Sequence, residues 1–166
     1  MKPSLLLAAL ALAAASPLFA SVKVGRTIKA LIERAAVIGA DKPLEDPVAE
    51  SLGYDDPPAA KVLIYQADKA SDKRDHELHV VFAGKKKKAV ALIWANTVTA
   101  ANEAGEKILD SYRFRTSPDG KLTHAVHSHG KIGEVAQTVL DIETTETKYA
   151  YEKERAFFLN EAPGLD

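Results

Sequence analysis

The chain of 166 residues has no cysteine and almost no excess charge of either sign. Without cysteine, we exclude disulfide scaffolds, thiolate zinc sites, cysteine nucleophiles, thiol redox chemistry and a cysteine-linked lipid anchor. The 22 lysines and arginines against 23 aspartates and glutamates give a formal net charge of −1. A chain with this balance has no general attraction to polyanions, so the sequence predicts no nucleic-acid partner.

The sequence also lacks the common catalytic fingerprints. It contains no G-x-S-x-G nucleophile elbow, no G-x-x-x-x-G-K-[ST] phosphate loop, no G-x-G-x-x-G turn and no H-E-x-x-H pair. The acidic residues at 55–56 and 143–146 have no spacing that indicates acid–base catalysis. We therefore interpret the chain as a binding or accessory protein without a cofactor rather than as an enzyme.

One apolar run stands out, at the N-terminus. Lys2 supplies a positive charge, Leu5–Ala15 is apolar throughout, and Ser16-Pro17 breaks the run ahead of a small residue, Ala20. The run has 11 residues, whereas a membrane-spanning helix needs about 20, so we prefer a cleaved signal to a retained anchor. The pattern predicts a signal peptide, Met1–Ala20, and hence a periplasmic or secreted protein without a membrane anchor. Cleavage would remove Lys2 and change the formal charge from −1 to −2.

The mature chain is expected to begin with a helix. Apolar residues in Val24–Ile38 recur every three or four positions, which predicts an amphipathic helix that ends at Gly39. The proline-rich segment Asp41–Ala60 is expected to be an irregular connection. Within it, Asp46-Pro47 predicts the start of a short helix that runs to about Leu52.

Strand patterns follow from residue 61. In His76–Phe82 alternate residues separate into an apolar set and a more polar set, and Ala89–Trp94 is apolar on both faces, which predicts a central strand. The other expected segments here are a strand at Val62–Tyr65, hairpin turns at Asp68–Asp75 and Gly84–Lys87, and a polar loop at Asn96–Lys107.

The clearest turn signal is Ser117-Pro118-Asp119-Gly120, in which Pro and Gly suit the second position and the left-handed position of a tight hairpin. In the preferred pairing of the two strands on either side of this turn, Phe114 faces His124. This register gathers the apolar side chains on one face. In the alternative, slipped by one residue, Phe114 faces Thr123. We expect the first register because it buries the aromatic side chains.

Near the C-terminus, Gly130–Ile142 is expected to be a further strand or loop and Thr145–Asn160 a helix. A strand through Tyr149 and Tyr151 is the alternative to that helix. Together the elements predict one α+β domain: an N-terminal helix, an antiparallel meander of five or six strands, and a C-terminal helix. The domain is expected to be roll-like, with one helix-covered sheet face, and to span residues 21–162 before a disordered tail at 163–166. This order of elements resembles that of cystatin-like and NTF2-like rolls, a likeness of fold that carries no function.

The preferred register brings Arg113, Arg115 and His127 to one sheet face. Two guanidinium groups two residues apart can clamp a carboxylate or phosphate. The alternative is a solvated face whose charges pair with neighbouring glutamates. We interpret the three residues as a candidate anion site.

The five histidines are the other concentrated reactive group. His127 and His129 share a strand face, whereas His124 points to the opposite face, so a third metal ligand must come from elsewhere, such as His79. His127, His129 and His79 are therefore the candidate metal ligands. The alternative is that His124 packs in the core and the other two are ordinary polar residues.

A run of four lysines, Lys85–Lys88, falls at a predicted hairpin turn. It has no interleaved aromatic residues, so we interpret it as a solubilising tip rather than a nucleic-acid site.

Three functions remain open at this point. The first is an exported, non-enzymatic binding domain whose ligand is a small anion, a peptide or an envelope protein. The second is a small cavity enzyme of hydrolase or isomerase type that uses His127 with Asp110 or Glu77. The third is a periplasmic protein that binds metal through its histidines. The sequence does not indicate the oligomeric state.

Overall fold

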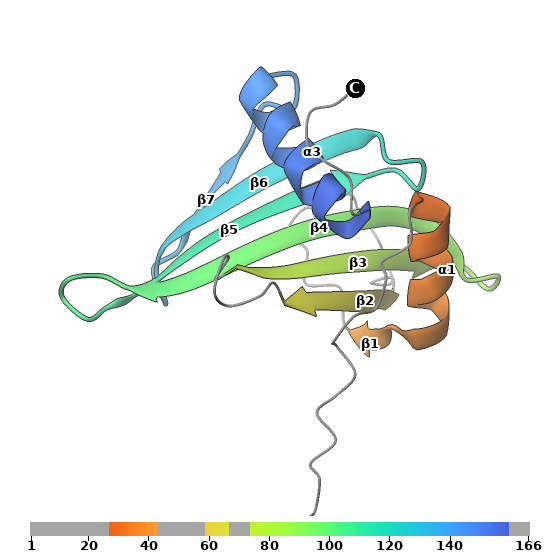
Figure 1. The fold of residues 1–166 in the computed structure, drawn as a ribbon, viewed down its shortest axis with the longest axis horizontal. Coiled ribbons are helices and arrows are strands. Elements are labelled where there is room, and N and C mark those ends of the chain that lie inside the picture. The colour runs from red at the N-terminus through yellow and green to blue at the C-terminus, as the bar shows by residue number, and fades with distance from the viewer. Residues whose placement is uncertain (1–26, 43–58, 67–73, 160–166) are drawn as a thin grey trace, which may run out of the picture.

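A computed structural model describes residues 27–42, 59–66 and 74–159. In this part of the chain, two helices flank a seven-stranded antiparallel sheet in which each strand pairs with its neighbours in sequence (Figure 1). The elements are α1 Ile28–Ile38, β1 Ala40–Lys42, β2 Ala59–Gln66, β3 Asp75–Ala83, β4 Lys88–Ala101, β5 Lys107–Thr116, β6 Leu122–Lys131, β7 Ala136–Val139 and α3 Thr145–Leu159. The α+β class with terminal helices is thus confirmed. The expected count of five or six strands is too low, mainly because the three-residue strand β1 lies where an irregular connection was predicted.

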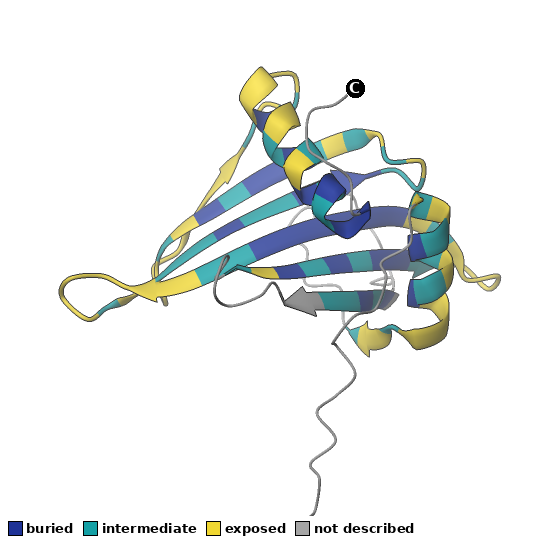
Figure 2. Ribbon diagram, in the orientation of Figure 1, coloured by how far each residue is buried: buried dark blue, intermediate teal, exposed yellow. Residues whose placement is uncertain are grey.

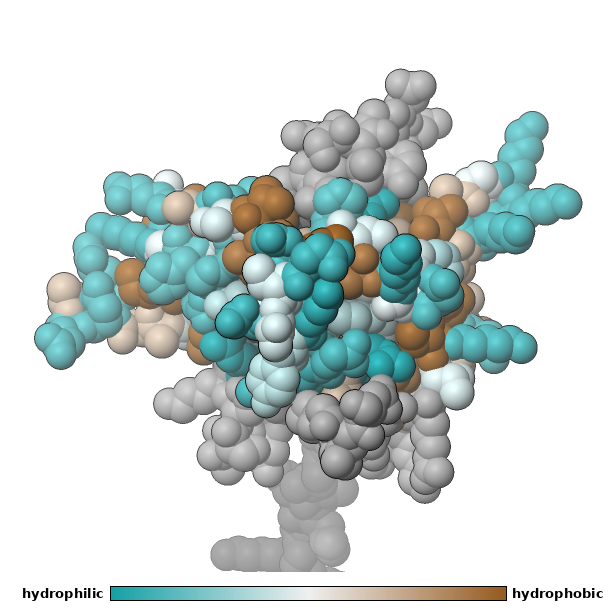
Figure 3. Space-filling model, turned by 90° about the horizontal axis from the view of Figure 1, so that it is seen from above, coloured by the Kyte–Doolittle hydropathy of each residue, from teal (hydrophilic) through white to brown (hydrophobic). Residues whose placement is uncertain are grey.

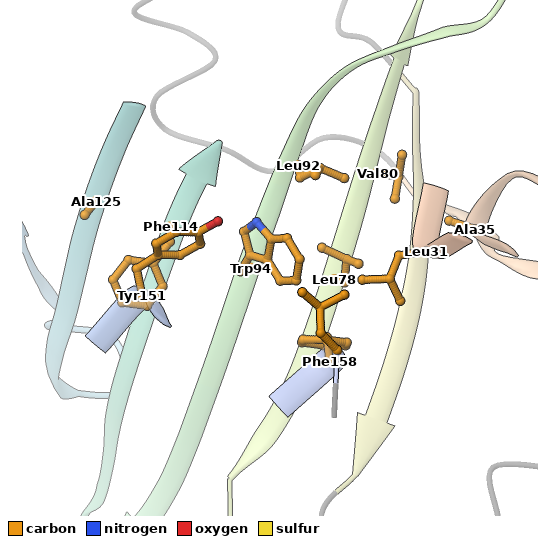
Figure 4. Close-up of a cluster of buried hydrophobic side chains, with 11 residues drawn as sticks. Leu31, Ala35, Leu78, Val80, Leu92, Trp94, Phe114, Ala125, Tyr151 and Phe158 are labelled. Carbon is orange, nitrogen blue, oxygen red and sulfur yellow. The ribbon is translucent and has the colours of Figure 1, made fainter. Parts of the chain in front are cut away.

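Both helices pack on the same face of the sheet, as Figure 1 shows; we name this the helix-covered face. Its core centres on Trp94, whose ring makes edge contacts with Phe158 at 5.8 Å and with Tyr151 at 6.2 Å between centroids (Figure 4). The Trp94 indole donates a hydrogen bond to the buried Thr116 hydroxyl at 3.1 Å. Other buried members come from α1 and from strands β3 to β6: Leu31, Ala35, Leu78, Val80, Leu92, Phe114 and Ala125.

The opposite side of the sheet, which we name the second face, carries a smaller buried apolar cluster. Val81, Ala91 and Ile93 are at most 4 % exposed. Residues 91–96 in the middle of β4 are therefore buried on both faces, as the dark blue centre of the sheet in Figure 2 illustrates. This confirms the prediction that the apolar segment Ala89–Trp94 is a central strand.

The N-terminal ends of both helices follow local capping rules. The Thr27 hydroxyl accepts a hydrogen bond from the Ala30 amide at 3.2 Å and caps α1, which begins at Ile28. The first residues of the predicted helix, from Val24 to Arg26, lie outside the described residues. In the same way the Thr144 hydroxyl accepts from the Thr147 amide at the start of α3. The helix reading of this C-terminal segment is confirmed over the strand alternative.

The long hairpin between β4 and β5 corrects another expectation. The predicted polar loop at Asn96–Lys107 shrinks to residues 102–106, because both strands continue in register to Ala101 and Lys107. Polar side chains on these strands satisfy one another, as in the 2.9 Å hydrogen bond between the Thr97 and Ser111 hydroxyls. Polarity alone therefore does not end a strand whose partner is equally polar.

The tight turn at 117–120 forms as predicted, with the Gly120 amide bonded to the Ser117 carbonyl at 2.9 Å. The register beyond it follows neither of the two expected patterns. Thr116 opposes Leu122, but the next pair is Arg115 with His124, and Phe114 then faces Ala125 instead of His124 or Thr123.

The cause of this shift is a β-bulge in which Thr123 is the extra residue of β6. Its hydroxyl donates a hydrogen bond to the Arg115 carbonyl at 3.0 Å, which satisfies backbone that the bulge leaves without a ladder partner. From this point on, every side chain of β6 occupies the face opposite to the one expected.

Several expectations lie outside the described residues. These are the signal peptide Met1–Ala20, the short helix at 46–52, most of the turn at 68–75 and the tail at 163–166. Of the helices that the structure describes, none has the length and apolar character needed to cross a membrane.

Tyr151 offers a test of how α3 is docked. Its hydroxyl donates to the Gly120 carbonyl at 2.7 Å, and its ring is buried among Trp94 and Phe114. Tyr151→Phe should lower the free energy of unfolding by about 1 kcal/mol, because it removes this hydrogen bond and keeps the ring. Tyr149→Phe on the same helix is the control, since Tyr149 is 58 % exposed. Equal urea-unfolding curves for the two variants would contradict the assignment.

Candidate functional site

The structure does not bring the three candidate anion ligands together. Arg113 and Arg115 lie on the second face, where Arg113 opposes Val126 and Arg115 opposes His124. His127 lies on the helix-covered face, opposite Tyr112, whose ring stacks on the imidazole at 4.2 Å. The bulge at Thr123 causes the separation, because it reverses the faces of β6 relative to β5.

The two arginines also differ in access. Arg115 is only 7 % exposed and is not among the residues that line the hollow on the second face. Arg113 is half-buried and lines a hollow of about 390 Å³ on the second face. Only Arg113 of the predicted set is therefore placed to meet a ligand there.

This hollow is built by neighbouring rows of side chains that run across the strands. In one row, Glu77, Ala95 and Arg113 are direct cross-strand neighbours on β3, β4 and β5. The next row is polar throughout: Asp75, Thr97, Ser111, Ser128 and Gln137. His79, Leu109 and Val135 complete the lining.

Opposite charges face each other over the small side chain of Ala95. Two strand spacings of about 4.8 Å each put the backbones of β3 and β5 about 10 Å apart. The His79 imidazole, 2.9 Å from the Glu77 carboxylate, holds the pKa of Glu77 below its usual value against the opposing effect of burial, and the charges of Lys42 and Arg113 add to the shift. Glu77 therefore stays ionised beside Arg113, and the hollow contains both signs of charge.

A second polar group lies on the helix-covered face, under α3. The Glu154 carboxylate is 4 % exposed, yet it accepts a hydrogen bond from the Asn96 amide at 2.9 Å and lies 2.9 Å from the His76 Nδ1. Phe157 stacks on the His76 ring at 3.7 Å between centroids. The sequence analysis did not identify Glu154; the one available signal was His76, a polar residue on the apolar side of its strand.

The hydrogen bonds continue from Asn96 toward β6. The Arg74 guanidinium donates to the Asn96 Oδ1 and to the Asp110 Oδ2, both at 3.1 Å. The other oxygen of Asp110, Oδ1, is 2.6 Å from the His127 Nε2. Burial acts to raise the pKa of Asp110, but the hydrogen bonds from His127 and Arg74 outweigh it and hold the pKa below its usual value.

These depressed carboxylate pKa values have a defined effect on stability. Glu77 and Asp110 release their protons at lower pH in the folded chain than in the unfolded chain, where the ordinary values are 4.5 and 3.8. The stability that the two ionised carboxylates add to the folded state is therefore complete above their unfolded-state pKa values. It is lost as the pH falls through their lower folded-state pKa values.

The predicted metal ligands are also divided between the faces. His127 and His129 lie together on the helix-covered face, both beside Asp110. His79 lies on the second face and is bonded to Glu77. His124, expected to oppose Phe114, is instead half-buried opposite Arg115 on the second face. The four lysines Lys85–Lys88 are exposed at the β3–β4 turn, and their role as a solubilising tip stays a prediction.

The buried carboxylate gives a stability prediction. Glu154→Gln should lower the free energy of unfolding by about 3 kcal/mol, because a neutral amide cannot replace a carboxylate that His76 and Asn96 both contact. Glu152→Gln is the matched control on the same helix, since Glu152 forms a surface pair with Arg155 worth less than about 1 kcal/mol. Chemical unfolding measures both; a Glu154→Gln effect as small as that of the control would disprove the role assigned to Glu154.

Comparisons of the chain with protein-family models, with curated proteins and with solved structures found no match. The functional argument therefore rests on two features of the described residues. One is the charged hollow on the second face, and the other is the carboxylate–imidazole group on the helix-covered face.

Proposed function

We propose that the protein is an exported, non-enzymatic binding protein that holds a small zwitterion, such as an amino acid or short peptide, in the hollow of the second face. The observation that carries this proposal is the row Glu77–Ala95–Arg113, which places a carboxylate and a guanidinium on either side of a small residue. A ligand carboxylate would bind Arg113, and a ligand ammonium group would bind Glu77 or Asp75.

The size and lining of the hollow support a small polar ligand. Its volume of about 390 Å³ falls at the lower end of the range found for small-molecule sites. Ser111 and Ser128 are buried in the polar row and offer hydroxyl groups to a bound peptide unit. A zwitterion can contact both signs of charge in this lining, whereas a singly charged ligand can contact only one.

The alternatives receive less support. The His127–Asp110 pair that a cavity enzyme would use lies on the helix-covered face, and the hollow lies on the second face. An envelope-protein partner would be favoured by a large apolar surface. On the side viewed in Figure 3, hydrophobic residues occur instead in small groups among hydrophilic ones.

The binding proposal is tested with glycylglycine as a zwitterionic probe, and with acetate and methylammonium as its singly charged halves. We expect glycylglycine to raise the Tm of the wild-type protein more than either half does. Arg113→Gln should weaken glycylglycine binding about tenfold, which corresponds to about 1.4 kcal/mol, as measured by calorimetry. Arg113 alone is substituted because the buried Arg115 would also disturb the fold.

Lys121→Gln is the control for this experiment, since it removes the same charge from an exposed position outside the hollow. A Tm response of Arg113→Gln equal to that of wild type would overturn the proposed anion contact. Acetate raising the Tm as much as glycylglycine would show that the ligand is a simple anion and not a zwitterion.

Export is a separate part of the proposal and rests on the sequence of Met1–Ala20. Expressed with this segment in a bacterial host, the protein should be released by osmotic shock with Ser21 as its first residue. N-terminal sequencing and intact mass measure this directly. A full-length protein found only in the cytoplasmic fraction would contradict export.

A further inference from the structure

A group of three potential metal ligands lies on the helix-covered face, away from the proposed ligand hollow. Asp110 on β5 opposes His129 on β6, and His127 lies two residues earlier on the same side of β6. One ligand atom from each residue lies within 4.8 Å of those of the other two. Strand pairing brings the three together. Asp110 and His129 are cross-strand neighbours and so share a face, and His127 shares that face because it lies two residues from His129 on the same strand.

The distances within this group suit a small divalent ion. The Asp110 Oδ1 is 2.6 Å from the His127 Nε2 and 3.6 Å from the His129 Nδ1. Zinc bonds of about 2.1 Å in tetrahedral geometry separate neighbouring ligand atoms by about 3.4 Å. The two observed distances lie on either side of that value, so small side-chain movements without a change of backbone would admit the ion.

The surroundings orient the ligands and leave one side accessible. Arg74 occupies the Asp110 Oδ2, which leaves Oδ1 directed toward the two imidazoles. Tyr112 stacks on His127 and restricts the rotation of its ring. The His129 side chain is 61 % exposed, so an ion can enter from solvent and a water molecule can complete its coordination.

We propose that Asp110, His127 and His129 bind one zinc-like divalent transition-metal ion. The donor set of two imidazoles and one carboxylate is one that zinc accepts in proteins, with the fourth position left to solvent. The site differs from the predicted set in its third ligand, because His79 lies on the second face and is bonded to Glu77. The nearby positive charge of Arg74 favours modest rather than very tight affinity.

The test is a calorimetric titration of Zn²⁺ into full-length protein without a histidine tag, after treatment with a chelator. We expect one ion per chain. His129→Gln should weaken binding by more than about tenfold, and because His129 is exposed the variant should keep its fold. Asp110→Asn should do the same, with circular dichroism and apo-protein Tm as checks on its folding. Mg²⁺ should not bind, because it prefers oxygen ligands.

Two control variants keep the test specific. His124→Gln removes an imidazole from the second face of β6. His79→Gln removes the third ligand of the set predicted from sequence, which the structure places on the second face. Both should bind Zn²⁺ as wild type does. The proposal is overturned if wild type binds no Zn²⁺, if His129→Gln binds it normally, or if His79→Gln loses it. Co²⁺ gives an independent readout, because its visible absorption bands should appear with wild type and vanish with His129→Gln. None of these results depends on a ligand in the hollow, so the two proposals succeed or fail separately.

Discussion

The contact between the Glu154 carboxylate and its two donors determines how the helix-covered face is assembled. Burial of a carboxylate costs several kcal/mol unless hydrogen bonds replace its water. The donors, His76 and Asn96, are fixed side by side on β3 and β4, where they are cross-strand neighbours. A shift of α3 along the sheet by one turn would leave the carboxylate buried without them. Apolar packing brings α3 to the sheet, but this polar contact selects the position in which Tyr151 and Phe158 meet Trp94.

The same contact extends to the group around Asp110. Asn96 donates to Glu154 through its Nδ2 and accepts from Arg74 through its Oδ1, so neighbours on both sides fix the orientation of its amide. Arg74 in turn holds one oxygen of Asp110, whose other oxygen faces His127. A continuous line of charged and polar groups thus links α3 to β6. Each member limits the freedom of the next, which is how a chain without disulfides orders side chains at a half-exposed edge of its core.

The sequence predicts the features of this fold that depend on neighbouring residues, but not those that depend on contacts between residues far apart in the chain. The alternation in β3, the turn at 117–120 and the helix at Thr145–Leu159 follow from local patterns, and the structure confirms them. The length of β4 beyond Asn96 could not be predicted, because its polar half is held by the equally polar β5. Glu154 resembled any other helical glutamate, since its role depends on donors 58 and 78 residues away.

The extra residue Thr123 has the largest chemical effect of the features that the sequence did not indicate. Without the bulge, His127 would oppose Ser111 and lie diagonally beside Arg113, so that three basic groups would share the second face. With the bulge, His127 lies on the helix-covered face beside Asp110. A carboxylate then faces two imidazoles, and Arg113 is left to face Glu77 across Ala95. One added residue therefore separates His127 from the two arginines and places each near a carboxylate, His127 beside Asp110 and Arg113 across Ala95 from Glu77.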